Sequence, residues 1–483
     1  MSTLESLVFD NGFARLPETF HSRVQATPLP APYLVCHSPA ALELLGLDPG
    51  EIERPELIET LAGNRLLPGM DALAALYAGH QFGHYVPQLG DGRALLLGEV
   101  NGWEIQIKGG GRTPYSRGGD GRAVLRSSIR EFLCSEAMHA LGVPTTRALA
   151  IVGSDRPVYR EDEETAALVT RLAPSFVRFG SFEVFYYRNQ VEPIRQLADY
   201  VIARYYPELA ALADPYPEFL RQVAVRTAGL IAQWQAVGFA HGVMNTDNMS
   251  ILGLTLDYGP FGFLDAFDPG YVCNHSDTGG RYAFDQQPDV AAWNVTKLAQ
   301  ALVPLMSVEA ASDAIKDYPQ AFGQDYVALM AAKFGLAQDR DSVPLIVDAL
   351  ALLAQHRVDY TRFMRRLCDF DSSPGAANAP LRDLFPDRPA FDAWAARYAA
   401  ALRHAGTPDS ARGQAMRALN PKYILRNHLA EIAIRRAVDA RDYSEIARLH
   451  ALLAHPYDEQ PEFDAYAAEP PDWASRIEVS CSS

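Results

Sequence analysis

A glycine-rich turn is the first feature of this sequence that could contact a phosphate group. Residues 89–93 read LGDGR and contain Gly90, Gly92 and Arg93. Glycines allow backbone N–H groups to approach a phosphate closely, and an arginine can pair with its oxygens. The same turn could be purely structural, so its meaning depends on the motifs that follow it.

Lys108 and Glu131 form the second candidate pair. Lys108 ends the alternating segment Trp103–Lys108 (WEIQIK), which has the period of a strand, and Glu131 lies in 123–141, whose apolar residues have the spacing of an amphipathic helix. A strand lysine paired with a helix glutamate holds an ammonium group against nucleotide phosphates in protein kinases. A surface lysine and a solvated glutamate are the alternative.

The segment 241–248, HGVMNTDN, follows a predicted long helix at Tyr216–Val237. Kinase-like enzymes have a catalytic loop at this point, with an Asp base near its start and an Asn metal ligand near its end. Asn248 fills the Asn position. Val243 stands where the Asp is expected and cannot accept a proton, so Asp247 is the only carboxylate in the loop.

Asp257 begins the motif Asp-Tyr-Gly nine residues after Asn248. Kinases carry a metal-binding Asp at this place, and Asn, Asp and phosphate oxygens suit a hard octahedral cation. The four motifs in this order predict a site for a nucleotide and a divalent metal ion.

The elements that must position these residues divide into a smaller β-rich lobe and a larger helical lobe. The organisation predicted is an extension packed on the body (1–70), an N-lobe (71–190), a helical C-lobe (191–470) and a tail (471–483). Within it we expect a helix at 71–78, a hairpin from Ala94–Val100 and Trp103–Lys108, and strands at 146–152 and 166–172.

Composition narrows the class of protein. The 483 residues include 43 basic and 59 acidic side chains, a net charge of −16 that disfavours a nucleic-acid partner. The sequence has no long apolar run, no recognisable targeting segment and no CxxC pair among its five cysteines. We therefore expect a cytoplasmic protein with no membrane partner, and nothing demands more than a monomer.

Several longer motifs resemble the selenoprotein O / YdiU family, over nearly the whole chain. They are AGHQFG (78–83), QLGDGR (88–93), QIKGGGRTPYSR (106–117), GDGRA (119–123), HGVMNTDN (241–248), DYGP (257–260) and the final CSS (481–483). The resemblance implies an α+β, protein-kinase-like two-lobed fold that lacks the usual catalytic Asp. It also implies transfer of AMP from ATP, or of UMP from UTP, to Ser, Thr or Tyr hydroxyls of target proteins, with release of pyrophosphate and with Mg²⁺ or Mn²⁺.

The resemblance also assigns residues. Asp247 becomes the proton acceptor, Asn248 and Asp257 hold the metal ion, and Glu131 is the partner of Lys108. The implied nucleotide-binding residues are Gly90, Gly92, Arg93, Lys108, Asp120, Gly121, Arg171, Arg178 and Asp257. Considered by residue type alone, Asp120 could instead cap the following helix, and Arg171 and Arg178 could form surface salt bridges.

The resemblance implies a redox role for Cys481, which stands where many members carry selenocysteine. Cys273 lies sixteen residues after Asp257, in the segment that corresponds to a kinase activation loop. We hypothesise that a disulfide between Cys273 and Cys481 ties the tail to this segment; two reduced cysteines are the alternative.

Two other functions stay open at this point. A kinase that moves the γ-phosphate is disfavoured by Val243. An inactive pseudokinase that binds ATP as a scaffold is disfavoured because Lys108, Glu131, Asn248 and Asp257 are all present.

Overall fold

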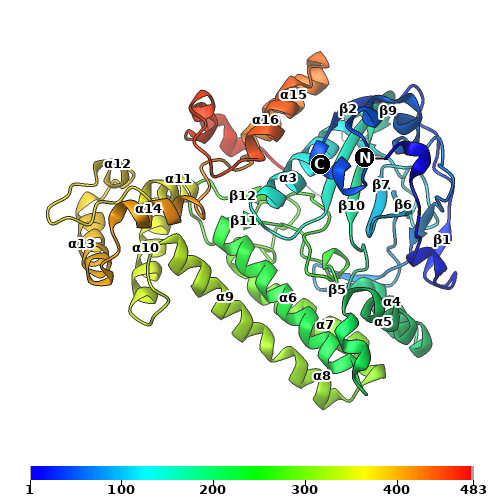
Figure 1. Cartoon of the computed structure of the whole chain (residues 1–483), viewed down its shortest axis with the longest axis horizontal. Coiled ribbons are helices and arrows are strands. Elements are labelled where there is room, and N and C mark those ends of the chain that lie inside the picture. The colour runs from blue at the N-terminus through cyan, green and yellow to red at the C-terminus, as the bar shows by residue number, and fades with distance from the viewer. Residues whose placement is uncertain (1, 161, 480–483) are drawn as a thin grey trace.

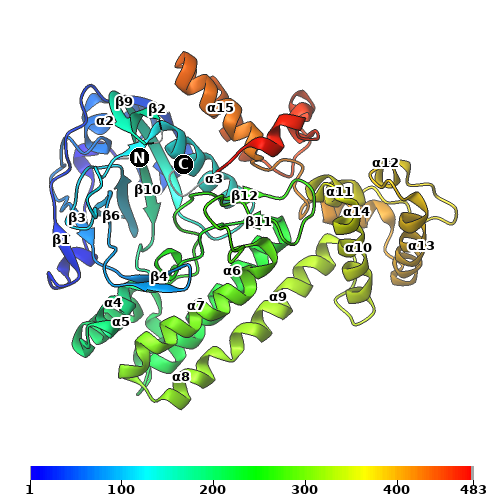
Figure 2. The same ribbon diagram turned by 180° about the vertical axis from the view of Figure 1, so that it is seen from behind.

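An antiparallel sheet fills much of the N-terminal half of the chain, and helices form most of the remainder (Figure 1). The computed structural model describes residues 2–160 and 162–479. Figure 2, the view from behind, shows the sheet and the long helices side by side, joined along the segment that carries β11 and β12. The structure is therefore mixed α and β, with the sheet first and the helices second.

The main sheet has the order β1-β3-β6-β7-β10-β9-β2, with β8 pairing to β10. Its strands are β1 His21–Arg23, β2 Tyr33–His37, β3 Leu73–Ala75, β6 Ala94–Val100, β7 Trp103–Lys108, β8 Ala123–Val124, β9 Arg147–Tyr159 and β10 Glu163–Ala173. Two short hairpins lie outside it: β4 Gly79–Gln81 with β5 His84–Val86, and β11 Phe239–Ala240 with β12 Gly262–Phe263. Both edge strands of the main sheet, β1 and β2, come from the first 70 residues.

The expected hairpin between β6 and β7 is confirmed, with both bounds as predicted. Its turn residues Asn101 and Gly102 have φ of 52° and 79°, the pair of positive values that a tight hairpin turn of this kind requires. The expected helix at 71–78 is wrong, because Leu73–Ala75 pairs with β1 and β6 as strand β3. An Ala/Leu run this short has no periodicity that separates a helix from a buried strand.

Helix α3, Leu125–Ala140, packs against β9 and β10 on one side and against α15 (Asn427–Ala440) and α16 (Ser444–Leu453) on the other. The predicted range of 123–141 is nearly right, but the first two residues form β8 instead. Because α3 is covered on both sides, even its polar residues Arg130, Glu131 and Glu136 are buried. A charged residue on this helix therefore has to find a partner inside the protein.

The long helices form the second part of the main core. The predicted helix at Tyr216–Val237 is confirmed as α6, and it ends where Gly238 adopts a left-handed φ of 73°. The other helices near the sheet and α6 are α1 Pro39–Leu44, α2 Pro55–Leu61, α4 Gly180–Tyr187, α5 Val191–Tyr205, α7 Gln287–Leu302, α8 Val308–Ile315 and α9 Asp317–Lys333.

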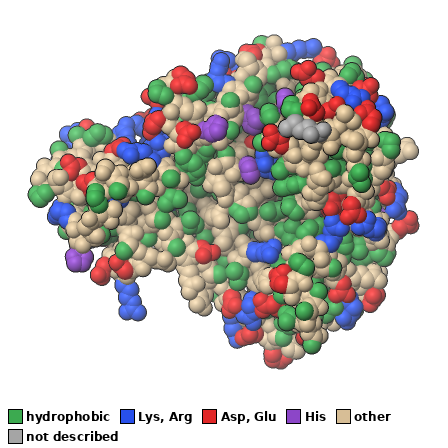
Figure 3. Space-filling model, viewed as in Figure 1, with side chains coloured by type: hydrophobic (Ala, Val, Ile, Leu, Met, Phe, Trp, Pro, Cys, Tyr) green, Lys and Arg blue, Asp and Glu red, His purple; other side chains and the backbone are tan. Residues whose placement is uncertain are grey.

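A second group of helices projects at the far end from the sheet (Figure 1). It consists of α10 Ser342–His356, α11 Tyr360–Leu367, α12 Ala379–Arg382, α13 Arg388–Ala405 and α14 Asp409–Arg417. Phe363, Trp394 and Tyr398 are buried in a second hydrophobic cluster, which continues into the main body through residues such as Ala236 and Phe334. On the face seen in Figure 3, acidic and basic side chains are interspersed over both parts. Among the described residues, no helix is long and apolar enough to cross a bilayer.

Candidate active site

A pocket of about 590 Å³ lies between the turns that flank β6 and β7 and the loops at 243–260. This volume is in the range of small-molecule sites. Among its lining residues are Gly90, Gly92, Arg93, Lys108, Asp120, Gly121, Arg171, Arg178, Asp247, Asn248 and Asp257. The structure therefore brings to one cavity every residue expected to contact a nucleotide, a metal ion or a transferred proton.

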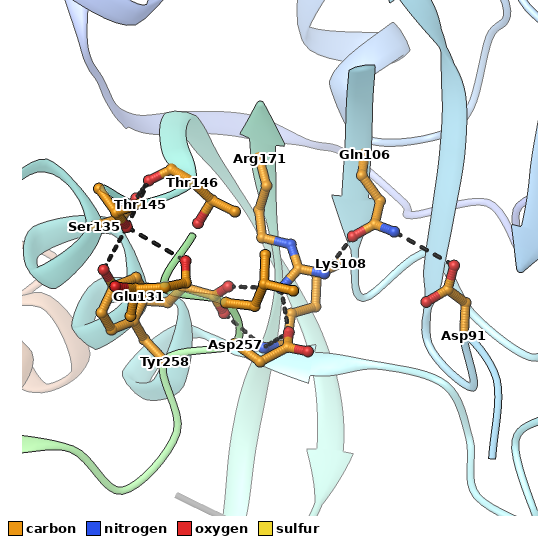
Figure 4. Close-up of polar contacts among 12 residues, drawn as sticks. Asp91, Gln106, Lys108, Glu131, Ser135, Thr145, Thr146, Arg171, Asp257 and Tyr258 are labelled. Carbon is orange, nitrogen blue, oxygen red and sulfur yellow. Dashed lines mark hydrogen bonds and ion pairs between the residues drawn. The ribbon is translucent and has the colours of Figure 1, made fainter. Parts of the chain in front are cut away.

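Lys108 is buried at the end of β7 and makes an ion pair with Glu131 of α3 (Figure 4). The distance from Lys108 Nζ to Glu131 Oε2 is 2.7 Å. Burial lowers the pKa of Lys108, and the nearby carboxylates of Glu131 and Asp257 oppose this effect. The alternative of a surface lysine and a solvated glutamate is therefore excluded, because both side chains are buried.

Arg171 reaches the same place from the neighbouring strand, β10. The strand register sets it opposite Gln106, whose side-chain oxygen accepts a hydrogen bond from its guanidinium group. Arg171 also donates to Glu131 Oε1 at 3.0 Å and pairs with Asp257. With 2% of its surface exposed, Arg171 does not form a surface salt bridge.

Arg178 approaches Asp257 from the other side. It pairs with the second oxygen of Asp257 and donates to the backbone carbonyl of Asp247 at 2.7 Å. Its guanidinium lies 4.9 Å from the ring centre of Tyr77, and it is also 2% exposed. The turn after β10 therefore carries Arg178 back to the pocket beside Arg171.

Lys108 and Arg171 meet at Asp257 (Figure 4), and Arg178 pairs with the second oxygen of the same carboxylate. Burial alone would raise its pKa, but Arg178, Arg171 and Lys108 outweigh that effect and hold the pKa well below the usual range. Asp257 also has a positive φ of 56°, in the left-handed region that aspartate adopts more readily than most residues other than glycine. Its ion pairs with Arg171 and Arg178 fix the side chain at this position.

Asp247 lies in a 3-10 turn, Thr246–Asn248, and is 7% exposed. Its Oδ2 accepts a hydrogen bond from Gln81 Nε2 at 3.2 Å, and its Oδ1 has no hydrogen-bond partner among the described residues. Burial raises the pKa of Asp247 to about 7, although Gln81 and Arg178 act in the opposite direction. This carboxylate is far less firmly paired than that of Asp257.

The oxygens of Asn248 and Asp257 fit a hard divalent cation. Asn248 Nδ2 donates to Val243 O at 2.9 Å, which leaves the amide oxygen as the ligating end of that side chain. No group of three or more His, Cys, Asp or Glu side chains within the described ranges could hold a metal ion. An ion bound here would take further ligands from phosphate and water, as Mg²⁺ commonly does.

The glycine-rich turns form the opposite wall of the pocket. Gly90 and Gly121 have positive φ, and a Cβ added at Gly121 would lie 2.0 Å from Gly111 O, so this close approach requires glycine. Asp120 accepts a hydrogen bond from Arg122 N and pairs with Arg160 at 2.9 Å. Because α3 begins only at Leu125, after Val124, Asp120 does not cap this helix.

Three further polar residues line or support the pocket and were missed in the sequence. Gln106 holds Arg171 and stands two residues before Lys108, a strand spacing that could have revealed it. Asp91 lies inside the LGDGR motif; it is buried and accepts from Ala75 N at 3.1 Å and Gln106 Nε2 at 3.3 Å. Gln81, within AGHQFG, lines the pocket and contacts Asp247, but no local sequence pattern indicated this role.

Cys273 is buried, with its Sγ 3.5 Å from Ala240 O, and it is not among the lining residues of the pocket. Cys481 lies outside the described residues, so its pairing with Cys273 stays a prediction. The last described residue, Val479, accepts a hydrogen bond from His275 N at 2.9 Å.

Comparison with known proteins gives consistent names. The family model described as "Protein adenylyltransferase SelO" matches residues 3–454. A "Protein nucleotidyltransferase YdiU" of Thiobacillus denitrificans is 81% identical over 488 residues, covering 100% of both chains. Proteins of the same name from Myxococcus xanthus and Thioalkalivibrio sulfidiphilus are 55% and 57% identical, again over 100% of both chains.

Proposed function

This chain belongs to the SelO family of protein adenylyltransferases, and from that premise we propose that it transfers AMP from ATP to Ser, Thr or Tyr hydroxyl groups of proteins, releasing pyrophosphate. The family establishes the enzyme class, nucleotidyl transfer. The acceptor side chains, the leaving group and the roles of individual residues are part of the proposal.

The convergence of Lys108, Arg171 and Arg178 in one pocket is the observation that carries the proposal. Negative charge accumulates on the leaving pyrophosphate during attack at the α-phosphorus. Preorganised buried cations stabilise such charge, and positioning with electrostatics accounts for most of the catalysis in phosphoryl transfer. Glu131 and Asp257 hold these cations in place by ion pairs.

Asp247 is the proposed proton acceptor. The target hydroxyl loses its proton to the carboxylate of Asp247, its oxygen forms a bond to the α-phosphorus, and the bond from that phosphorus to the pyrophosphate oxygen breaks. Val243 has no group that could accept this proton. General-base assistance typically contributes 10²–10⁴-fold to a rate.

Asn248 and Asp257 would hold the metal ion, Mg²⁺ or Mn²⁺. When bound, the ion neutralises phosphate charge and helps to orient the nucleotide. The chain's own contribution is to hold the two ligands: Val243 O fixes the Asn248 amide, and Arg171 and Arg178 contact Asp257.

We further propose that the molecule is a two-lobed, protein-kinase-like enzyme, with 71–190 as the N-lobe and 191–470 as the C-lobe. A strand lysine paired with a helix glutamate, followed in the chain by a polar loop and an Asp-Tyr-Gly motif, supports this proposal. The tail at 471–483 is proposed as a separate redox element.

The test is a paired labelling experiment. The protein is incubated with Mg²⁺ or Mn²⁺, reductant, a soluble protein extract and ATP labelled at either the α- or the γ-phosphate. We expect label from the α-position only, a mass gain of one AMP on hydroxyl side chains, and a 10²–10⁴-fold slower reaction for Asp247→Ala with ATP binding retained.

Other outcomes would change the proposal. Label from the γ-position would make the protein a kinase. Faster transfer from α-labelled UTP would make UMP the preferred group. No label from any nucleotide, together with metal-independent ATP binding, would favour a scaffold.

A further inference from the structure

The β4–β5 hairpin, residues 79–86, carries the AGHQFG motif but has no role in the function proposed above. It belongs to neither the main sheet nor the helical part, yet it lies against the loop that contains Asp247. Three consecutive residues, His80, Gln81 and Phe82, each contact this loop. Such dense contact from a two-stranded hairpin calls for an explanation beyond packing.

Each of these three residues donates a hydrogen bond to a different residue of the loop. His80 N donates to Thr246 Oγ1 at 2.7 Å, Gln81 Nε2 to Asp247 Oδ2 at 3.2 Å, and Phe82 N to Asn245 Oδ1 at 3.2 Å. Behind them, His80 Nδ1 lies 3.0 Å from the buried carboxylate of Glu183, which also accepts from Thr246 Oγ1 at 3.1 Å. The hairpin and the loop are therefore joined by several hydrogen bonds.

Gly79 makes the closest approach. A Cβ added there would lie 2.6 Å from Asp247 Oδ1, 2.9 Å from its Cβ and 3.1 Å from its Cγ. All three nearest atoms belong to the side chain of Asp247. Gly79 does not have a positive φ, so the φ angle does not by itself require glycine, and the atoms that an alanine Cβ would meet first are those of Asp247. The space at Gly79 is thus occupied by the carboxylate.

We propose that Gly79 and Gln81 are positioning residues for the Asp247 carboxylate: Gly79 leaves the space in which Oδ1 lies, and Gln81 holds Oδ2 by donating a hydrogen bond. This inference rests on the proposed role of Asp247 as proton acceptor. Two fixed oxygens define the plane of the carboxylate, and a displacement of about 1 Å in a reacting group can cost about 10²-fold in rate.

The first test uses Gly79→Ala. We expect a 10- to 100-fold lower rate of AMP labelling at saturating ATP, with the affinity for ATP and the melting temperature close to those of the wild type. Gly279→Ala is the matched control, because a Cβ there meets nothing within 4 Å and Gly279 is exposed. An unchanged rate in Gly79→Ala would overturn the proposal.

The second test separates the hydrogen bond of Gln81 from simple packing. Gln81→Glu keeps the size of the side chain but replaces the donor with a like charge beside Asp247, whereas Gln81→Leu removes the whole amide, donor included, without adding a charge. We expect the labelling rate to fall in the order wild type, Leu, Glu. If Gln81 acted only by packing, the isosteric Glu variant would label faster than the Leu variant. This order of rates would contradict the proposal.

The matched control for Gln81 is His84→Ala. His84 is the cross-strand partner of Gln81 in the hairpin, and it is exposed. We expect wild-type labelling from this variant. A loss as large as that of Gln81→Leu would indicate that the hairpin matters only through its folding, which would also refute the specific role of Gln81.

A crystal structure of Gly79→Ala keeps the test independent of activity. We expect the Asp247 side chain to be displaced and its contact with Gln81 to be lost. An unmoved carboxylate refutes the inference even if the wild type transfers no AMP. Conversely, a displaced carboxylate together with an inactive wild type would uphold the geometry and refute the proposed function.

Discussion

Two buried lysines, Lys108 in the sheet region and Lys333 at the end of α9, have opposite surroundings. Lys108 pairs with Glu131 at 2.7 Å and lies 3.5 Å from Asp257. Lys333, which is 4% exposed, donates to the carbonyl of Leu419 at 2.9 Å, and no carboxylate within 2–160 and 162–479 pairs with it. Burial lowers the pKa of Lys333 to about 8.

The different surroundings of the two lysines distinguish a functional site from a hydrophobic core. Burying a charge is costly unless charged partners compensate, and Lys108 has such partners in Glu131 and Asp257 at the edge of the pocket. Lys333 lies instead among the apolar residues of the projecting helices and has a single neutral acceptor. A buried charge therefore indicates function here only where several groups of both signs converge on open space.

The largest expected effect comes from breaking the cluster at its centre. Asp257→Asn removes the carboxylate shared by Arg171 and Arg178 and leaves two buried cations underpaired. We expect a loss of about 3–5 kcal/mol in the free energy of unfolding, measured by urea denaturation at pH 7. A loss below about 1 kcal/mol would mean that the cations are far better solvated than their burial indicates.

Exchanging each lysine for methionine tests the functional side of the comparison. Lys108→Met should lower the rate of AMP labelling by about 10²–10³-fold, because one preorganised cation is lost from the pocket. Lys333→Met should leave the labelling rate unchanged, since Lys333 does not line the pocket. Labelling assays and calorimetric titration with ATP check both variants. Equal losses of labelling rate in the two would contradict the conclusion that only Lys108 belongs to the functional site.

Lys333 also predicts a pH dependence of stability. The unfolded chain holds this proton up to about pH 10.5, whereas the folded protein releases it at about pH 8, so the charged lysine destabilises the fold fully below pH 8. This cost declines as the pH rises from 8 to 10.5. The free energy of unfolding of Lys333→Met should therefore be about 1–3 kcal/mol greater than that of the wild type at pH 7.

The advantage of Lys333→Met should shrink toward pH 10.5. Urea denaturation of both proteins across this pH range gives the difference directly, and groups that titrate in both proteins cancel. A difference that stays constant with pH would show that folding does not lower the pKa of Lys333.

The smallest effect should come from an exposed ion pair in the projecting helices. Arg397 and Asp348 lie 2.8 Å apart, with side chains 54% and 45% exposed. Asp348→Asn should change the free energy of unfolding by at most about 1 kcal/mol, because solvent screens such pairs. Asp348→Asn, measured in the same urea assay, is the control for Asp257→Asn. If the two variants lost a comparable free energy of unfolding, burial of the ion pair would not explain the effect at Asp257.

Much of the site could be predicted from local sequence. Trp103–Lys108 alternates cleanly, so the strand and the position of Lys108 at its end followed from its period, and α6 followed from its spacing and from Gly238. The helix expected at 71–78 failed, because strand pairing with β1 and β6 decided a run with no clear period. Gln81 could not be found, because its partner lies 166 residues away.

The sequence by itself determined which chemical groups are present, their order along the chain and the periods of the elements that carry them, because these depend on neighbouring residues. Only the tertiary structure decided that Arg171, Arg178 and Lys108 meet at Asp257, and that Gly79 leaves room for Asp247. Such convergence depends on strand register and on turns between distant segments. Local spacing holds no information about either.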